Sequence, residues 1–177
     1  MRGASPLARN SAIERVRFSP IVWRRRTARF LALPWRERRN LVSFVLGFHL
    51  VAGALRFWQY QKVVAALQRT TGILMRRAPR NPLPPDRIVD LVDMSSNAAM
   101  WRPNCLQRSV MVWWALLAAG WDSEIRFGAR RRSDGSGFDF HAWVERSGEV
   151  INDDPSIGTV FIPLSTATEL PPEARLM

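Results

Sequence analysis

Three residues in the C-terminal half of the chain have the types and the order that nucleophilic catalysis requires. Cys105 is the only cysteine, and His141 and Asp153 follow it, twelve positions apart. A thiolate can attack a carbonyl carbon, an imidazole can carry protons, and a carboxylate can hold the imidazole in the right tautomer. Because a single cysteine is more often a small buried apolar residue, the elements that position these three side chains decide how far the pattern can be trusted.

Cys105 is predicted to stand at the first position of a helix. Asn104 is a good N-cap, Gln107 completes a capping box three residues later, and Gly120 is a helix stop. At that position the positive end of the helix dipole and the free backbone N–H groups favour a thiolate. The same N–H groups can bind a developing oxyanion.

His141 and the acid are predicted to lie on adjacent strands of a hairpin. A three-residue loop, Arg146-Ser147-Gly148, places His141 directly opposite Asp153. Cβ atoms in such cross-strand pairs are about 4.5–5.5 Å apart. A two-residue loop, Ser147-Gly148, would place His141 opposite Asp154 instead. We favour Asp153 as the orienting acid and keep Asp154 as the alternative.

The apolar patterning predicts an α+β domain, in which a helix bearing the cysteine packs on a small antiparallel sheet. A cysteine at a helix start, followed by a histidine and an acid on adjacent strands, resembles the arrangement of papain-like and transglutaminase-like enzymes. We expect a basic, α-helical N-terminal extension over residues 1–75, a proline-rich linker over 76–86 and the cysteine protease core over 87–177. The predicted helices besides the Cys105 helix cover 34–55, 57–70 and 87–97, and the predicted strands cover 124–130, 138–145, 149–153 and 159–164.

Three short motifs resemble those of lasso-peptide B proteins, the transglutaminase-like leader peptidases of lasso-peptide biosynthesis. The motifs are Cys105-Leu106-Gln107-Arg108-Ser109, Phe140-His141-Ala142-Trp143-Val144-Glu145 and Ile151-Asn152-Asp153. They occur in order within residues 87–165. A looser likeness extends to the arginine-rich stretch 33–39.

The resemblance implies a cysteine peptidase that removes the leader from a ribosomally made precursor peptide, before an ATP-dependent cyclase closes the ring. Cys105 would be the nucleophile, His141 the general base and acid, and Asp153 the orienting residue. No cofactor is implied. Residues 1–80 lack the hairpin-rich start of a leader-recognition domain, so the resemblance points to the split form, which needs a separate recognition protein. A transglutaminase-like acyltransferase uses the same triad and stays an alternative.

Two tryptophans and an arginine flank the triad in sequence and are candidates for lining a substrate groove. These are Trp101, Arg102 and Trp143, although aromatic residues are more often part of a core. The sequence does not separate a substrate role from a solvent role for Arg102 or Arg108.

The formal net charge of +11 is concentrated at one end of the chain. Residues 1–80 hold 17 basic and 2 acidic side chains, and residues 81–177 hold 9 and 13. We do not expect nucleic-acid binding, because no recognition motif accompanies the arginines. One cysteine and two histidines also exclude a zinc site built from several thiolates.

The apolar run 40–55 lies between arginines and is the one segment that suggests a membrane. At 16 residues it would span about 24 Å as a helix, short of a bilayer core of about 30 Å. We therefore favour a buried or interfacial helix over a transmembrane span. The N-terminus does not resemble a secretory signal, so we expect a cytoplasmic protein. The apolar helices, including 40–55, are candidates for docking the recognition protein, the cyclase or a membrane surface. A non-enzymatic, membrane-associated binding protein is the rival hypothesis.

Overall fold

The computed structural model describes residues 30–75 and 82–164. By its internal contacts the chain divides into two compact units, Met1–Asn40 and Leu41–Met177. In the described part of the first unit, the guanidinium of Arg38 lies 5.9 Å from the centre of the Trp35 ring. The second unit contains all three residues of the candidate triad.

The helices that precede the sheet agree closely with the predicted ones. Within the described ranges they are α3 (Trp35–Phe57), α4 (Tyr60–Met75), α5 (Pro85–Ala98) and α6 (Cys105–Ala118). The second helix begins at Tyr60 instead of 57, because α3 continues to Phe57. Pro85 occupies the first turn of α5, where its missing N–H needs no partner.

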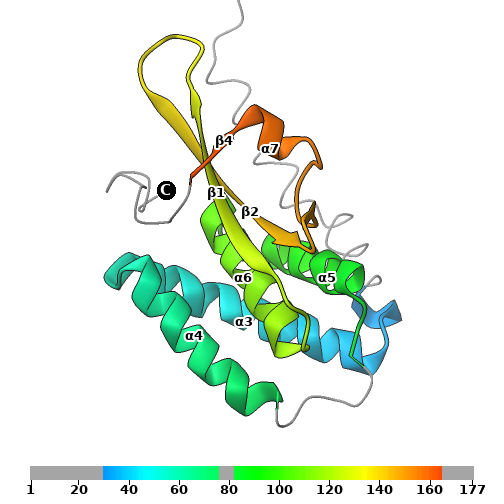
Figure 1. Ribbon diagram of the computed structural model, residues 1–177. Helices are drawn as coiled ribbons and strands as arrows, with labels where there is room; N and C mark the ends of the chain where they lie inside the picture. Colours follow the sequence, from blue (N-terminus) through cyan, green and yellow to red (C-terminus); the bar gives the residue numbers. More distant parts are fainter. Residues whose placement is uncertain (1–29, 76–81, 165–177) are drawn as a thin grey trace, which may run out of the picture. The chain divides into compact units, whose positions relative to one another are not determined.

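Helix α6 is the centre of the core. Almost every face of it is buried, which is expected of a helix that is apolar all round. It contacts α4 and α5 on one side and β1 and β2 on the other (Figure 1). The core that it shares with the other elements includes Phe48 and Val51 of α3, Val92 of α5 and Val144 of the sheet.

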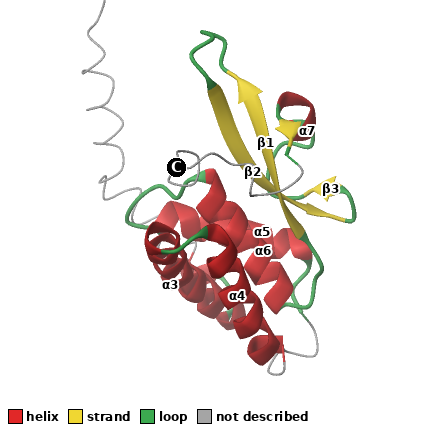
Figure 2. Ribbon diagram, turned by 60° about the vertical axis from the view of Figure 1, so that its left-hand side comes forward, coloured by secondary structure: helices red, strands yellow, loops and turns green. Residues whose placement is uncertain are grey.

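The sheet is antiparallel, with the strand order β3-β2-β1-β4. Figure 2 shows the strands on one side of the helical layer. The strands are β1 (Glu124–Arg131), β2 (Phe138–Arg146), β3 (Glu149–Val150) and β4 (Ile162–Pro163), and a short helix, α7 (Ile157–Val160), precedes β4. The first two strands were predicted almost to the residue.

The hairpin between β2 and β3 corrects the predicted register. Arg146 pairs with Glu149, so the loop has two residues and not three. Both loop residues have positive φ, 53° at Ser147 and 82° at Gly148. Two such residues in succession form the type I′ turn that matches the twist of the flanking strands. Glycine at the second position adopts a positive φ without steric cost, so the two-residue loop can form.

The last two strands are shorter than expected. β3 ends at Val150 instead of continuing to residue 153, and the segment predicted as a strand over 159–164 contains the end of α7 and only the two residues of β4. The chain after β3 leaves the sheet edge, forms α7, and returns to pair with the far side of β1.

The proline-rich linker over 76–86, and the domain boundaries on either side of it, remain predictions. Residues 76–81 of the proline-rich segment lie outside the described residues, and α5 already begins at Pro85. Helix α3 from Leu41 onward belongs to the same compact unit as the triad.

The outer face of the sheet is partly buried, which simple alternation did not predict. Trp143 shares this face with His141, yet its side chain is fully buried. Phe161, which follows α7, covers this part of the sheet and is also buried. Gly128 lies opposite His141 in the register. A Cβ atom there would come within 2.7 Å of the Phe161 Cβ and 2.9 Å of the Trp143 ring.

We expect Gly128→Ala to lower the free energy of unfolding by about 1–3 kcal/mol, because the added methyl group overpacks two buried aromatic side chains. Chemical denaturation measures the change. Gly158→Ala is the matched control, since a Cβ at that position meets nothing within 4 Å. Equal stability of the two variants would show that the contact at Gly128 relaxes freely.

Candidate active site

Cys105 stands at the first position of α6, as the capping pattern predicted. The backbone N–H of Gln107 donates to Asn104 Oδ1 at 2.8 Å, and the Asn104 N–H donates to Gln107 Oε1 at 3.2 Å. This reciprocal pair is a capping box, and it fixes the first turn of the helix. The sulfur is therefore at the positive end of the helix dipole.

His141 and Asp153 form a direct hydrogen bond. The distance from His141 Nε2 to Asp153 Oδ2 is 2.9 Å, and both side chains are about one-quarter exposed. With Nε2 occupied by the carboxylate, Nδ1 is the nitrogen left for the hydrogen bond between His141 and Cys105. The structure thus brings Cys105, His141 and Asp153 together.

The pKa values of Cys105 and His141 are shifted in the directions that favour an ion pair between the two side chains. Burial of Cys105 raises the pKa of its thiol, but the net shift of this pKa is downward. The lowering comes from a hydrogen bond with His141, from backbone hydrogen bonds with Ala142 and Leu106, and from the charge of His141. The pKa of His141 is raised, first by its hydrogen bond with Cys105, against burial, and then by Asp153. Both shifts favour a thiolate beside an imidazolium.

The edge of β2 is bonded to side chains where a neighbouring strand would otherwise lie. The Val144 N–H donates to Asn152 Oδ1 at 2.7 Å, and the Ala142 carbonyl accepts from Ser109 Oγ at 2.8 Å. Asn152 Nδ2 in turn donates to Ser109 Oγ at 3.2 Å. Because β3 stops at Val150, the first turns of α6 can reach this edge, and Cys105 meets His141 there.

This arrangement explains why Asp153, and not Asp154, bonds to His141. Continued pairing in the observed register would have placed Asp154 opposite His141. Instead the chain leaves the ladder, and the buried Asn152 side chain holds the loop against β2. The exposed Asp154 caps its own turn by accepting from Ser156 N and Oγ at 2.8 and 2.6 Å. The hydrogen-bond partner was predicted correctly, although the register that suggested it was wrong.

Arg108 holds the loop that carries Asp153. Its Nε and Nη2 donate to the two carboxylate oxygens of Asp93 on α5, at 2.8 and 3.0 Å. Nη2 also donates to the Asn152 carbonyl at 3.0 Å. The pKa of Arg108 is raised, first by its hydrogen bond with Asp93. The sequence did not decide whether Arg108 faces substrate or solvent. In the structure it links Asp93 of α5 to the loop that carries Asp153.

The three proposed groove residues lie in different environments. The Trp101 Nε1–H donates to Gln107 Oε1 at 3.4 Å, and its ring contacts His49 edge-on with centroids 4.6 Å apart. Trp143 is fully buried, with its Nε1–H bonded to Glu145 at 2.8 Å, so it has no surface to offer a substrate. Arg102 is exposed.

Phe161 is a neighbour of the site that sequence reasoning missed. Its ring stacks on His141 with centroids 5.1 Å apart and planes 29° apart. The guanidinium of Arg130 also lies over this ring, 4.9 Å from its centre. No local signal distinguishes Phe161 from any other apolar residue near a strand, because its contact with His141 depends on the return of the chain across the sheet.

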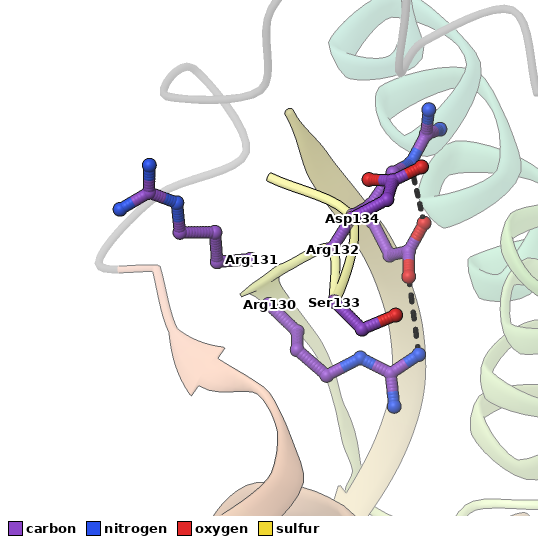
Figure 3. A pocket seen from close by; sticks show the side chains of 6 residues that line it. Arg130, Arg131, Arg132, Ser133 and Asp134 are labelled. Carbon is purple, nitrogen blue, oxygen red and sulfur yellow. Dashed lines mark hydrogen bonds and ion pairs between the residues drawn. The ribbon is translucent and has the colours of Figure 1, made fainter. Parts of the chain in front are cut away.

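An arginine-lined hollow of about 420 Å³ lies at the tip of the β1–β2 hairpin, and Arg130 is one of its lining residues. Arg130 and Arg132 both donate to Asp139, at 3.1 and 2.9 Å (Figure 3). Arg131 extends away from that pair. Within the ranges that the structure describes, no group of three or more His, Cys, Asp or Glu side chains could hold a metal ion.

The geometry can be compared with known proteins. The family model of the transglutaminase-like superfamily matches residues 44–166, which is more than half of the chain and includes Cys105, His141 and Asp153. The chain belongs to the transglutaminase-like superfamily. Its helix and antiparallel sheet agree with the predicted α+β, papain-like core. No curated protein and no solved structure matches the chain significantly.

Members of the transglutaminase-like superfamily are usually cysteine peptidases or acyltransferases. Both reactions begin with attack of a cysteine thiolate on a carbonyl group. Membership therefore supports the general reaction type, and it bears on neither the substrate nor the acyl acceptor.

We expect the rate of Cys105 alkylation by iodoacetamide to rise with pH through a midpoint below 9.0, the ordinary thiol pKa, because the pKa of Cys105 is lowered. The raised pKa of His141 extends its positive charge to a pH above its ordinary value of 6.5, so both shifts act in the direction that favours a thiolate beside an imidazolium. Mass spectrometry follows the reaction. In His141→Ala the midpoint should move upward, since a main cause of the lowering is lost; an unchanged midpoint would show that His141 does not stabilise the thiolate.

Proposed function

We propose that this protein is a cysteine peptidase that cleaves the leader from a ribosomally made lasso-peptide precursor. The observation that carries the catalytic part is the 2.9 Å hydrogen bond between His141 and Asp153. His141 also interacts with Cys105, and this interaction lowers the pKa of the thiol. The ordered motifs around these residues support the substrate class, because they resemble those of lasso-peptide B proteins.

The proposed reaction begins with attack of the Cys105 thiolate on the carbonyl carbon of the scissile amide bond. Backbone N–H groups in the first turn of α6 stabilise the oxyanion. The His141 imidazolium donates its proton to the leaving amine, the C–N bond breaks, and a thioester joins the acyl group to Cys105. His141 then removes a proton from water, which attacks the thioester and releases a carboxylate and the free thiol.

Asp153 keeps the ring of His141 in place through both proton transfers. Its carboxylate accepts the hydrogen bond from Nε2 and stabilises the imidazolium formed during the reaction. Arg108 and Asn152 support Asp153 through the backbone and are positioning residues in this scheme.

The proposed partners are the precursor peptide, a separate leader-recognition protein and a lasso cyclase. A separate recognition protein is proposed because the leader peptidases that this chain resembles occur in a split form. Cleavage is therefore tested with precursor and recognition protein together, and the products are identified by mass. A free leader ending in a carboxylate is the expected result.

A transglutaminase-like acyltransferase is the second candidate, and superfamily membership favours it equally. In that reaction an amine replaces water in the attack on the thioester. The same assay separates the two, because a leader joined to an added amine, without the free carboxylate, would support the acyltransferase. An intact precursor under all conditions would contradict both.

A further inference from the structure

Helix α3 is apolar on two faces, although only one of them packs in the domain. Its inner face carries Phe48 and Val51, which are at most 2% exposed. Its outer face carries a stripe of large apolar side chains that continues onto the residue after the helix. The stripe consists of Val42, Leu46, Leu50, Phe57 and Trp58, with exposures of 49, 61, 72, 79 and 61%. A helix that is apolar all round is normally covered on all sides.

A groove extends this outer face toward α4. It has a volume of about 420 Å³ and lies between Leu50 and Phe57 of α3 and Val63 and Leu67 of α4, with Trp114 of α6 contributing to its lining. The lining is almost wholly apolar, and it includes Leu50, Phe57 and Trp58 of the stripe. We call the stripe and the groove together the α3–α4 apolar face.

The segment that carries most of this face has charged side chains of one sign. Between Glu37 and Asp86 the sequence contains no acidic residue. In the described part of that stretch that belongs to the second unit, Arg56, Lys62 and Arg69 are all exposed. A partner that presents apolar groups together with negative charge would match both the apolar face and the basic side chains of its two helices.

We propose that the α3–α4 apolar face binds the surface of an anionic lipid bilayer. Apolar side chains enter the boundary between headgroups and acyl chains, and nearby arginine and lysine side chains meet anionic headgroups. The exposed Trp58 and Phe57 suit this depth, where aromatic side chains are favoured. The groove offers room for part of an acyl chain.

Attachment at the surface fits the structure better than a crossing of the bilayer. Within residues 30–75 and 82–164, α3 is the helix that is long and apolar enough to span a membrane by length and composition. However, Phe48 and Val51 pack in one core with α5 and α6. A spanning orientation would remove them from that core, whereas a surface contact uses only the outer face.

Sedimentation with lipid vesicles tests the proposal on the full chain. We expect the protein to pellet with vesicles of equimolar phosphatidylcholine and phosphatidylglycerol, and not with phosphatidylcholine alone. The double variant Leu50→Ser, Phe57→Ser should lower the partition coefficient about tenfold or more. Replacing Arg56, Lys62 and Arg69 with glutamine should lower it about fivefold per residue. Met100→Ser is the matched control, because Met100 is 88% exposed outside this face.

Circular dichroism checks that each variant is folded. Vesicle binding is measured without turnover, so its result is independent of the proposed peptidase activity. Absence of wild-type binding to the anionic vesicles at low salt would overturn the proposal. Equal binding by the folded Leu50→Ser, Phe57→Ser variant would do the same. Capture of an acidic protein through these residues, without vesicle binding, would replace the lipid with a protein partner.

Discussion

Cys105→Ala is expected to lower the rate of leader cleavage by about ten-thousandfold or more, a loss typical of removing a nucleophile from a catalytic triad. The reason is that no thioester can form, while the remaining groups can only polarise the substrate. Time courses of precursor cleavage, read by mass spectrometry with the recognition protein present, measure the loss. The helix cap formed by Asn104 and Gln107 does not involve the Cys105 side chain, so the variant should stay folded.

Chemical modification provides an independent control for this variant. Because Cys105 is the only cysteine in the chain, iodoacetamide treatment of the wild type should abolish cleavage as completely as the substitution does. Cys105→Ala treated in the same way should not change further. Cleavage that continues at the wild-type rate after either change would exclude Cys105 as the nucleophile.

Asp153→Asn is expected to reduce cleavage by about 10²- to 10⁴-fold while the fold is retained. Asparagine has nearly the same shape as aspartate, but it carries no charge to stabilise the His141 imidazolium. The first-order rate at saturating enzyme should fall with little change in substrate binding, because the side chain bonds to His141 at 2.9 Å and acts on the substrate only through it.

Asp154→Asn is the matched control for the acid. It makes the same chemical change one residue later, on a side chain whose bonds are with Ser156. We expect activity close to that of the wild type. If Asp154→Asn were the damaging variant and Asp153→Asn the neutral one, the observed pairing would not be the active one and the two-residue register would continue past Val150.

The helix that bears Cys105 could be predicted because its determinants are local. Asn104, Gln107 and Gly120 act on the backbone within a few residues, and the structure confirms the cap and the stop, with φ of 88° at Gly120. The strands β1 and β2 were predicted for the same reason, since alternation and the glycines between them are short-range features.

The support for Asp153 could not be predicted in this way. Arg108 bonds to Asp93, fifteen positions earlier, and to the Asn152 carbonyl, 44 positions later. Nothing local marks any of the three as partners. Asn152 bonds to Val144 and Ser109 because a strand ends early, and that end is itself a consequence of how the later chain packs.

The sequence by itself determined which residues can do chemistry here, and it determined the local structure that holds the nucleophile. Only the tertiary structure decided the turn type, the burial of Trp143 and the partner of Arg108. The physical reason is range: caps and turns depend on neighbours within about four residues. The register of a short strand and the burial of its second face depend on segments that return from elsewhere, here residues 151–164, which cross the sheet and bring Phe161 against His141.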